Sequence, residues 1–265
     1  MIPHTFSSLG CAEMTLDEVA TLARRHGMQT VELRALAGTT DLPKWLAGHF
    51  AAPATFKKHL QDLHLRVCAF GTSFRLIDGK DEDRAALLAY VPWAEAAGVP
   101  WLRIFDGGTT GDATELARAT EVFSWWREHR RANGWKVDLM VETHDALITT
   151  PRLQAFFEAV PDAALLWDSH HTWKKGGEDP VATWQAVGTR TVHIHVKDSV
   201  SRPNGNYPCT YVLPGDGEFP MAPLLKDLKA SNYRGLLSLE WERLWHPYLQ
   251  KLEDALNAAT QHQWW

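Results

Sequence analysis

Four short stretches of the chain combine acidic side chains with imidazole or amine groups: VETHD, WDSHH, HIHVKD and LSLEWE. Each stretch lies at or near the end of an apolar run of the kind that forms a buried β-strand. The carboxyl ends of parallel strands meet at one edge of a sheet, so these groups would collect at one point if the strands are neighbours. Carboxylates and imidazoles gathered in this way bind divalent cations and transfer protons.

The stretch Thr191–Ser199 shows most clearly how such groups are positioned. His193, His195 and Lys197 alternate with valine and isoleucine. Because the side chains of a strand alternate between its two faces, all three polar groups share one face. This pattern is typical of a barrel strand whose inner end lines a polar cavity, and equally of a half-buried antiparallel strand with a solvated face. In the barrel interpretation, His195 is a ligand, His193 supports it from below, and Lys197 contacts substrate at the rim.

The same alternation predicts inward-facing carboxylates at the ends of three further strands. Glu142 and His144 point inward at one strand end, Asp168 is the last residue of the next strand, and Glu240 faces inward at the last. With His195, these residues make a set of three carboxylates and one imidazole. Such a set favours Mn²⁺, Mg²⁺ or Co²⁺ and is compatible with Zn²⁺, and a bound cation would relieve the repulsion among the carboxylates. For any single carboxylate, a structural salt bridge is the alternative.

Strands and helices that alternate along the chain would position these groups. The predicted strands cover residues 1–8, 29–34, 65–70, 99–105, 137–143, 163–168, 191–197 and 235–240. Their alternation with helices, without a linker, predicts an α/β fold with one domain over residues 1–265, a single closed (β/α)8 TIM barrel. A doubly wound open sheet is the alternative, but FSSLGCAE lacks the GxGxxG that usually follows the first strand of such a sheet.

Residues that start or stop helices support this division. Thr15 and Glu18 have the spacing of a capping box and predict a helix that ends at Gly27. Pro92 predicts a kink or break in a helix, and Thr150 with the following proline predicts the cap of another. The predicted helices also include residues 41–63 in pieces, 82–97, 112–131, 180–187, 221–230 and 247–259.

Composition restricts the classes of partner. The 265-residue chain has a net charge of −5, which argues against nucleic acid as a partner and favours a small polar substrate. Its three cysteines form no CxxC, so we expect reduced thiols and a cytoplasmic protein. The N-terminal residues lack a signal-peptide pattern and no long apolar run is present, so we expect no membrane partner. A homo-oligomer is compatible with these features.

The four strand ends, with the GDG turn of residues 215–217 between the last two, resemble the xylose isomerase-like TIM barrel superfamily. Within it they are most similar to proteins labelled sugar phosphate isomerase/epimerase. The resemblance covers nearly the whole chain and is most specific over residues 141–245. It implies that one divalent metal ion, with Mn²⁺ expected first, is held by Glu142, Asp168, His195 and Glu240.

The resemblance also implies a reaction. In epimerases of this family, the two metal-bound glutamates, here Glu142 and Glu240, act as base and acid on opposite faces of a sugar or keto-sugar, phosphorylated or not. The metal stabilises a cis-enediolate between the two proton transfers. The histidine after the strand-six aspartate, here His171, is expected to contact substrate.

Other residues of the chain are similar instead to dehydratases of the superfamily. Lys197, His144 and the DxxHxxK pattern of residues 168–174, which includes Lys174, resemble the 3-dehydroshikimate dehydratases and inosose dehydratases. In those enzymes a histidine or lysine assists the loss of a β-hydroxyl from a keto-polyol. Epimerisation and dehydration share their first half, so the ligand set does not separate the two reactions. We expect a metal-dependent sugar isomerase or epimerase, with a C–O lyase as the alternative.

Further polar and aromatic residues are weaker candidates for substrate binding. Arg34 and Arg103 have inward-facing positions near strand ends and would bind an anionic or hydroxyl group, or else form salt bridges with Glu32 or Asp106. Trp173 would stack on a sugar face or serve in packing.

Two other classes of protein share this kind of fold. Endonuclease IV relatives need more metal ligands and a basic surface, which this acidic chain does not offer. A non-catalytic sugar-binding barrel predicts an incomplete ligand set, whereas all four positions are filled here.

Overall fold

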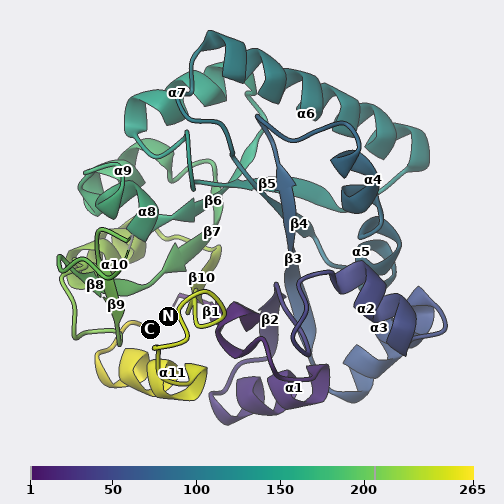
Figure 1. Cartoon of the computed structure of the whole chain (residues 1–265), viewed down its shortest axis with the longest axis horizontal. Coiled ribbons are helices and arrows are strands. Elements are labelled where there is room, and N and C mark those ends of the chain that lie inside the picture. Colours follow the sequence, from purple (N-terminus) through teal and green to yellow (C-terminus); the bar gives the residue numbers. More distant parts are fainter. Residues whose placement is uncertain (1, 206) are drawn as a thin grey trace.

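A computed structural model describes residues 2–205 and 207–265 of the chain. Eight parallel strands form one sheet in the order β1-β10-β7-β6-β5-β4-β3-β2, and helices surround it (Figure 1). A parallel bridge between Ser7 and Glu32 links the two ends of this order, so the sheet forms a nearly closed barrel. The predicted single (β/α)8 barrel is therefore confirmed, and the open-sheet alternative is wrong.

The barrel strands are β1 (His4–Phe6), β2 (Thr30–Leu33), β3 (Arg66–Arg75), β4 (Trp101–Phe105), β5 (Asp138–Glu142), β6 (Ala164–Asp168), β7 (Thr191–Val196) and β10 (Leu236–Leu239). The helices are η1 (Ser8–Cys11), α1 (Leu16–Arg25), α2 (Leu42–His49), α3 (Pro53–Asp62), α4 (Asp83–Leu88), α5 (Val91–Ala97), α6 (Ala113–Asn133), α7 (Thr150–Ala159), α8 (Ser169–Lys174), α9 (Pro180–Val187), α10 (Met221–Ala230) and α11 (Leu252–Gln261).

Several helix signals are found where the sequence places them. Thr15 and Glu18 form the predicted capping box of α1. The expected break near Pro92 separates α4 from α5, and this proline lies in the first turn of α5, where its missing N–H is not needed. The cap of α7 is Thr149 and not Thr150, whose hydroxyl donates to Glu178 instead.

Four features differ from the prediction. The short helix α8 directly follows β6, and an antiparallel hairpin of β8 (Asp198–Val200) and β9 (Thr210–Val212) follows β7. Strand β3 continues to Arg75, beyond the predicted end at residue 70. The helix expected from residue 247 begins at Leu252.

The inside of the barrel has an apolar floor. Cys68, Ala69, Met140 and Leu166 form a buried cluster separate from the main core between strands and helices. Met140 and Leu166 lie two residues before the last residues of β5 and β6, so they share a face with those strand ends. The inward-facing groups at the carboxyl ends therefore lie above this floor.

Within the described residues, no helix has both the length and the apolar character needed to span a bilayer. The three cysteines are buried and unpaired.

Candidate metal and catalytic site

The four predicted metal ligands lie together at the carboxyl ends of the strands. Glu142 ends β5, Asp168 ends β6, His195 lies on β7, and Glu240 directly follows β10. Their potential ligand atoms all lie within 4.8 Å of one another, and all four residues are buried. The Nδ1 atom of His195 is 3.4 Å from Glu142 Oε1 and 3.3 Å from Glu240 Oε1. We call these four residues the acidic cluster.

Glu32 on β2 orients the imidazole of the acidic cluster. Its Oε2 atom lies 2.8 Å from His195 Nε2 and 3.1 Å from His193 Nε2. His193 thus lies below His195, and both imidazoles contact the same Glu32 carboxylate. Burial raises the pKa of Glu32, but the two imidazoles outweigh it and hold this pKa well below its usual range. His195 therefore donates from Nε2 to an ionised carboxylate, which leaves Nδ1 as the atom that faces the cluster.

The cluster fits a divalent cation. His195 Nδ1 and Glu142 Oε2 are buried and have no hydrogen-bond partner among residues 2–205 and 207–265. Buried polar atoms are normally satisfied, so an unsatisfied nitrogen and oxygen beside two further carboxylates indicate donors for a ligand. A histidine whose second nitrogen is held by a carboxylate is the usual arrangement around protein-bound metals.

Lys197 lies deeper than the rim position expected from the sequence. Its side chain is 1% exposed, and its Nζ atom is 2.7 Å from both Asp168 Oδ2 and Glu242 Oε1 and also donates to Glu240. Burial lowers the pKa of Lys197, but these carboxylates outweigh it and raise the pKa well above its usual value. Lys197 is therefore an ammonium counter-ion inside the site.

Glu142 and Glu240 have different surroundings. Glu142 Oε2 lies 3.1 Å from Arg103 Nε and accepts no hydrogen bond from the part of the chain that the structure describes, whereas Glu240 Oε2 accepts one from Lys197. Burial raises the pKa of Glu240, but His195 and Lys197 outweigh it and hold this pKa well below its usual range. The two glutamates are thus not equivalent proton carriers.

The salt bridges expected for Arg34 and Arg103 are not the ones observed. Arg103 pairs with Glu142 and donates to the Thr72 carbonyl, while Arg34 donates to the Ser73 hydroxyl. Neither pairs with Glu32 or Asp106 in the described structure, because Glu32 binds the two histidines and Asp106 accepts from backbone N–H groups.

His144 and His171 face each other edge-on beside the cluster, with ring centroids 4.8 Å apart. His171 donates from Nδ1 to the Thr143 carbonyl, and burial together with Lys197 holds its pKa well below the usual value, so its ring is neutral. His144 is partly exposed and bonds Asp145 through Nδ1. Burial lowers the pKa of His144, but Asp145 and Glu142 outweigh it and raise this pKa.

Trp173 and Lys174 do not join the acidic cluster. Lys174 Nζ donates to Ser201 and Glu218 and lies 4.3 Å from the ring centroid of Trp173, which packs against Phe219. These two residues therefore lie outside the acidic cluster, and their role in substrate binding stays a prediction. Both residues lie in the last turn of α8, which Asp168 caps. From there Lys174 contacts Ser201, directly after β8, and Trp173 packs against Phe219.

Sequence reasoning assigned no role to Glu242 and considered Glu32 only as a salt-bridge partner of an arginine. Glu32 lies two residues before Arg34, and Glu242 lies two residues after Glu240. Because side chains two apart on a strand share a face, this alternation could have predicted that both glutamates face inward. Tyr211 lies on β9 and was not singled out, because the β8–β9 hairpin was not predicted. Its hydroxyl donates a hydrogen bond to Glu242.

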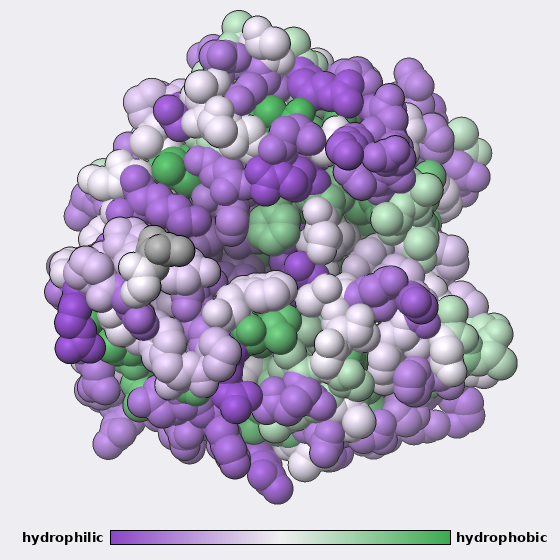
Figure 2. Space-filling model, in the orientation of Figure 1, coloured by the Kyte–Doolittle hydropathy of each residue, from purple (hydrophilic) through white to green (hydrophobic). Residues whose placement is uncertain are grey.

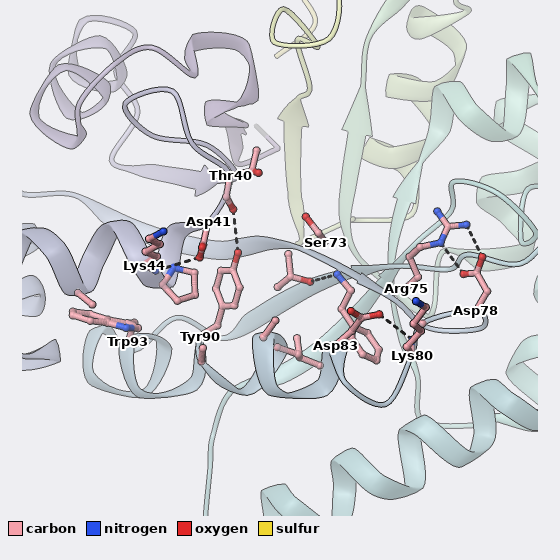
Figure 3. Close-up of a pocket in the computed structure, with 18 residues that line it drawn as sticks. Thr40, Asp41, Lys44, Ser73, Arg75, Asp78, Lys80, Asp83, Tyr90 and Trp93 are labelled. Carbon is pink, nitrogen blue, oxygen red and sulfur yellow. Dashed lines mark hydrogen bonds and ion pairs between the residues drawn. The ribbon is translucent and has the colours of Figure 1, made fainter.

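A cavity of about 860 Å³ lies between the loop before α2, the end of β3, and helices α4 and α5 (Figure 3). Ser73, Arg75, Tyr90 and Trp93 are among its lining residues, and Ser73 connects it to Arg34 through a hydrogen bond. In the view of Figure 2, the surface is hollowed near its middle, and both hydrophilic and hydrophobic side chains lie around the hollow.

Comparison with known proteins gives a family and several relatives. A family model described as "Xylose isomerase-like TIM barrel" matches residues 20–264. Two curated relatives from strains of Klebsiella pneumoniae, both named inosose dehydratase, are 27% identical over an alignment 144 residues long, which covers 49% of this chain and 48% of theirs. The chain thus spans about half the length of the curated relatives it matches.

Solved structures share the fold over the whole chain. The probable 3-DHS dehydratase AsbF of Bacillus anthracis has a TM-score of 0.77 at 15% identity, with 99% of this chain and 98% of that chain covered. The IolI protein with a bound zinc atom has a TM-score of 0.75 at 18% identity and coverages of 99% and 96%. D-psicose 3-epimerase has a TM-score of 0.68 at 16% identity and coverages of 99% and 98%.

Proposed function

Because the chain belongs to the xylose isomerase-like TIM barrel family, we propose that it is a divalent-metal-dependent C–O lyase that dehydrates a small keto-polyol. Glu142, Asp168, His195 and Glu240 would hold the cation. When bound, the cation polarises the substrate carbonyl and so acidifies the adjacent C–H bond. The hard donor set favours Mn²⁺ or Mg²⁺, and the zinc named in the IolI structure keeps Zn²⁺ among the candidates.

The contact of Lys197 with Glu240 is the observation that carries the choice of a lyase. An epimerase needs two groups that exchange protons with the two faces of the substrate. Here Glu240 Oε2 is bound by a buried ammonium, which disfavours its protonation. Burial raises the pKa of Glu142, but Arg103 and His195 outweigh it and lower this pKa too. Glu142 Oε2 nevertheless accepts no hydrogen bond within the described residues, whereas Glu240 Oε2 accepts one from Lys197, so we assign Glu142 as the base.

His144 supplies the second proton transfer. It is the partly exposed imidazole beside the cluster, and Asp145 orients it and favours its protonated form. In the proposed reaction, Glu142 takes the proton α to the carbonyl, the C–O bond at the β carbon breaks, and His144 protonates the departing hydroxyl. The products are water and an α,β-unsaturated ketone.

Epimerisation of a keto-sugar is the second candidate. It is favoured by the nearly equal distances of Glu142 and Glu240 from His195 Nδ1, 3.4 and 3.3 Å, which place the two carboxylates alike around the cluster centre. The name D-psicose 3-epimerase among the structural neighbours supports this candidate, and the relatives named inosose dehydratase support the lyase.

Incubation of the Mn²⁺-loaded protein with an inosose and with D-psicose in D₂O separates the two reactions. Dehydration yields an enone absorbance and loss of water, whereas epimerisation yields deuterium α to the carbonyl without loss of water. Glu142→Gln should abolish either reaction. Deuterium incorporation without an enone would contradict the lyase proposal.

A further inference from the structure

The carboxylate that orients His144 is itself held by an arginine. Asp145 Oδ1 lies 2.9 Å from His144 Nδ1, while the second oxygen of this carboxylate, Oδ2, is buried and lies 3.1 Å from Arg75 Nη2. This Oδ2 atom accepts no hydrogen bond from residues 2–205 and 207–265, so the Arg75 guanidinium compensates its charge. A buried carboxylate oxygen without a positive neighbour is costly, and Arg75 therefore restricts where the Asp145 side chain can lie.

On its other side, Arg75 is anchored by Asp78. Arg75 Nε donates to Asp78 Oδ1 at 2.7 Å and Arg75 Nη2 donates to Oδ2 at 3.0 Å, so the pair is bidentate (Figure 3). The nitrogens of a guanidinium have fixed directions, so this pair also sets the direction from which Arg75 contacts Asp145. Ion pairs and one hydrogen bond thus connect Asp78 through Arg75 and Asp145 to His144.

A change of strand register places Arg75 beside this loop. The pairing of β3 with β4 shifts between Gly71 and Arg75, so that Arg75 pairs with Phe105 at the end of β4. Irregularities of this kind re-aim a side chain and are frequent next to active sites. The part of β3 beyond its predicted end thereby brings Arg75 into contact with the loop after β5, which carries His144 and Asp145.

A glycine leaves room for the ion pair. Gly107 has a φ of +65°, and a Cβ atom there would collide with the Asp78 carboxylate and lie 3.2 Å from Arg75 Cβ. A side chain at this position would therefore displace the pair. The backbone of Asp145 has separate support, because its N–H donates to Asp106. Loss of Arg75 should thus release the Asp145 carboxylate and leave the path of the loop unchanged.

We infer that Arg75 is a positioning residue for the proposed reaction, because through Asp145 it holds the His144 imidazole with Nδ1 toward the carboxylate and Nε2 available to the substrate. This inference rests on the proposed function, in which His144 protonates the departing hydroxyl. After His144 has given up the Nε2 proton, it is the neutral tautomer with its hydrogen on Nδ1, which still donates to Asp145. With a mobile carboxylate, the ring would populate both tautomers and both orientations.

The test is nitrogen NMR of the histidine side chains in the Mg²⁺-loaded protein, which is diamagnetic, at a pH at which His144 is neutral. The nitrogen chemical shifts distinguish the two tautomers, and the signal missing from His144→Gln identifies this residue. We expect the Nδ1–H tautomer in wild type and a mixture with the Nε2–H tautomer in Arg75→Gln. Arg75→Met, which also removes the charge, serves if Arg75→Gln does not fold.

Kinetics give a second readout. Arg75→Gln should lower kcat for an inosose roughly 10-fold at nearly constant KM, because Arg75 acts on His144 and not on the substrate. Arg118→Gln is the matched control, since the Arg118 side chain is 36% exposed, against 41% for Arg75, and likewise pairs with two carboxylates, those of Asp81 and Glu121. This control should change neither the tautomer nor kcat.

Four outcomes would overturn the inference: the Nε2–H tautomer in wild type, the wild-type tautomer in the Arg75 variant, equal losses of kcat in the Arg75 and Arg118 variants, or a raised KM at unchanged kcat. The last outcome would make Arg75 a substrate contact. The tautomer is measured without substrate, so an Arg75-dependent tautomer in a protein that dehydrates no keto-polyol would refute the proposed function and leave the positioning of His144 standing.

Discussion

Replacement of Lys197 by methionine should destabilise the metal-free protein strongly, because three carboxylates would lose their common counter-ion. Lys197 Nζ contacts Asp168, Glu240 and Glu242, and its side chain is 1% exposed. Removing one partner from a buried ion pair costs about 3–5 kcal/mol. For a domain of this size, about 1 kcal/mol shifts the melting temperature by roughly 2–4 °C, so we expect a decrease of roughly 6–20 °C.

A divalent cation should restore much of that loss, because it would supply positive charge to the same carboxylates. The assay is a thermal melt of wild type and Lys197→Met with EDTA and with Mn²⁺, in which the metal-induced rise should be larger in the variant. The exposed Lys58→Met is the matched control, since its side chain is 72% exposed and pairs only with Asp62 in the described structure, and it should change stability by about 0.5 kcal/mol or less. The role assigned to Lys197 would be refuted if Lys197→Met had the melting temperature of wild type, or if Mn²⁺ raised the melting temperatures of the two proteins equally.

Three further substitutions test other parts of the account. Glu32→Gln should weaken Mn²⁺ binding by roughly 10- to 100-fold in calorimetry, because His195 loses the carboxylate that orients it; unchanged affinity would show that Glu32 does not position the ligand. Gly71→Ala should destabilise the protein by about 1–3 kcal/mol in urea unfolding, because its Cβ would meet the side chains of Arg34 and Arg103, whereas Gly48→Ala, which meets nothing within 4 Å, should not; equal effects would contradict this packing. Burial raises the pKa of Asp106 to about 6. The folded protein thus binds this proton more tightly than the unfolded chain, so wild type should lose stability relative to Asp106→Asn as the pH rises from about 4 to about 6. A difference in unfolding free energy between the two proteins that stays constant over this pH range would refute the raised pKa.

The fold and the acidic cluster were predictable because both depend on local regularities. The alternation of strands with helices predicts the barrel, and the period of two within each strand predicts that Glu142, His195 and Glu240 face inward. Neighbouring strands in register then bring these residues together, as the pairing of Asp168 with His195 shows. No contact had to be known in advance for this step.

The partners of these groups were not predictable in the same way. Glu32 and His195 are 163 residues apart in the sequence, yet their side chains are in contact. The alternation of side chains along a strand predicts which residues face inward but not which of them contact one another. Lys197 was expected at the rim because strand direction gives the face but not the depth of a long side chain. The positions of Trp173 and Lys174 were missed because α8 has only six residues, too few for a helical period to be recognised.

The most direct test of the central claim is a Mn²⁺ titration of the metal-free protein by calorimetry, with Asp168→Asn as the variant. Asp168 lies in the acidic cluster and is in contact with Lys197, so its carboxylate marks the site. The account predicts one high-affinity Mn²⁺ per wild-type chain and the loss of this binding in Asp168→Asn. Wild type that binds no Mn²⁺, or a variant that binds it with unchanged affinity and stoichiometry, would contradict a metal site at these residues.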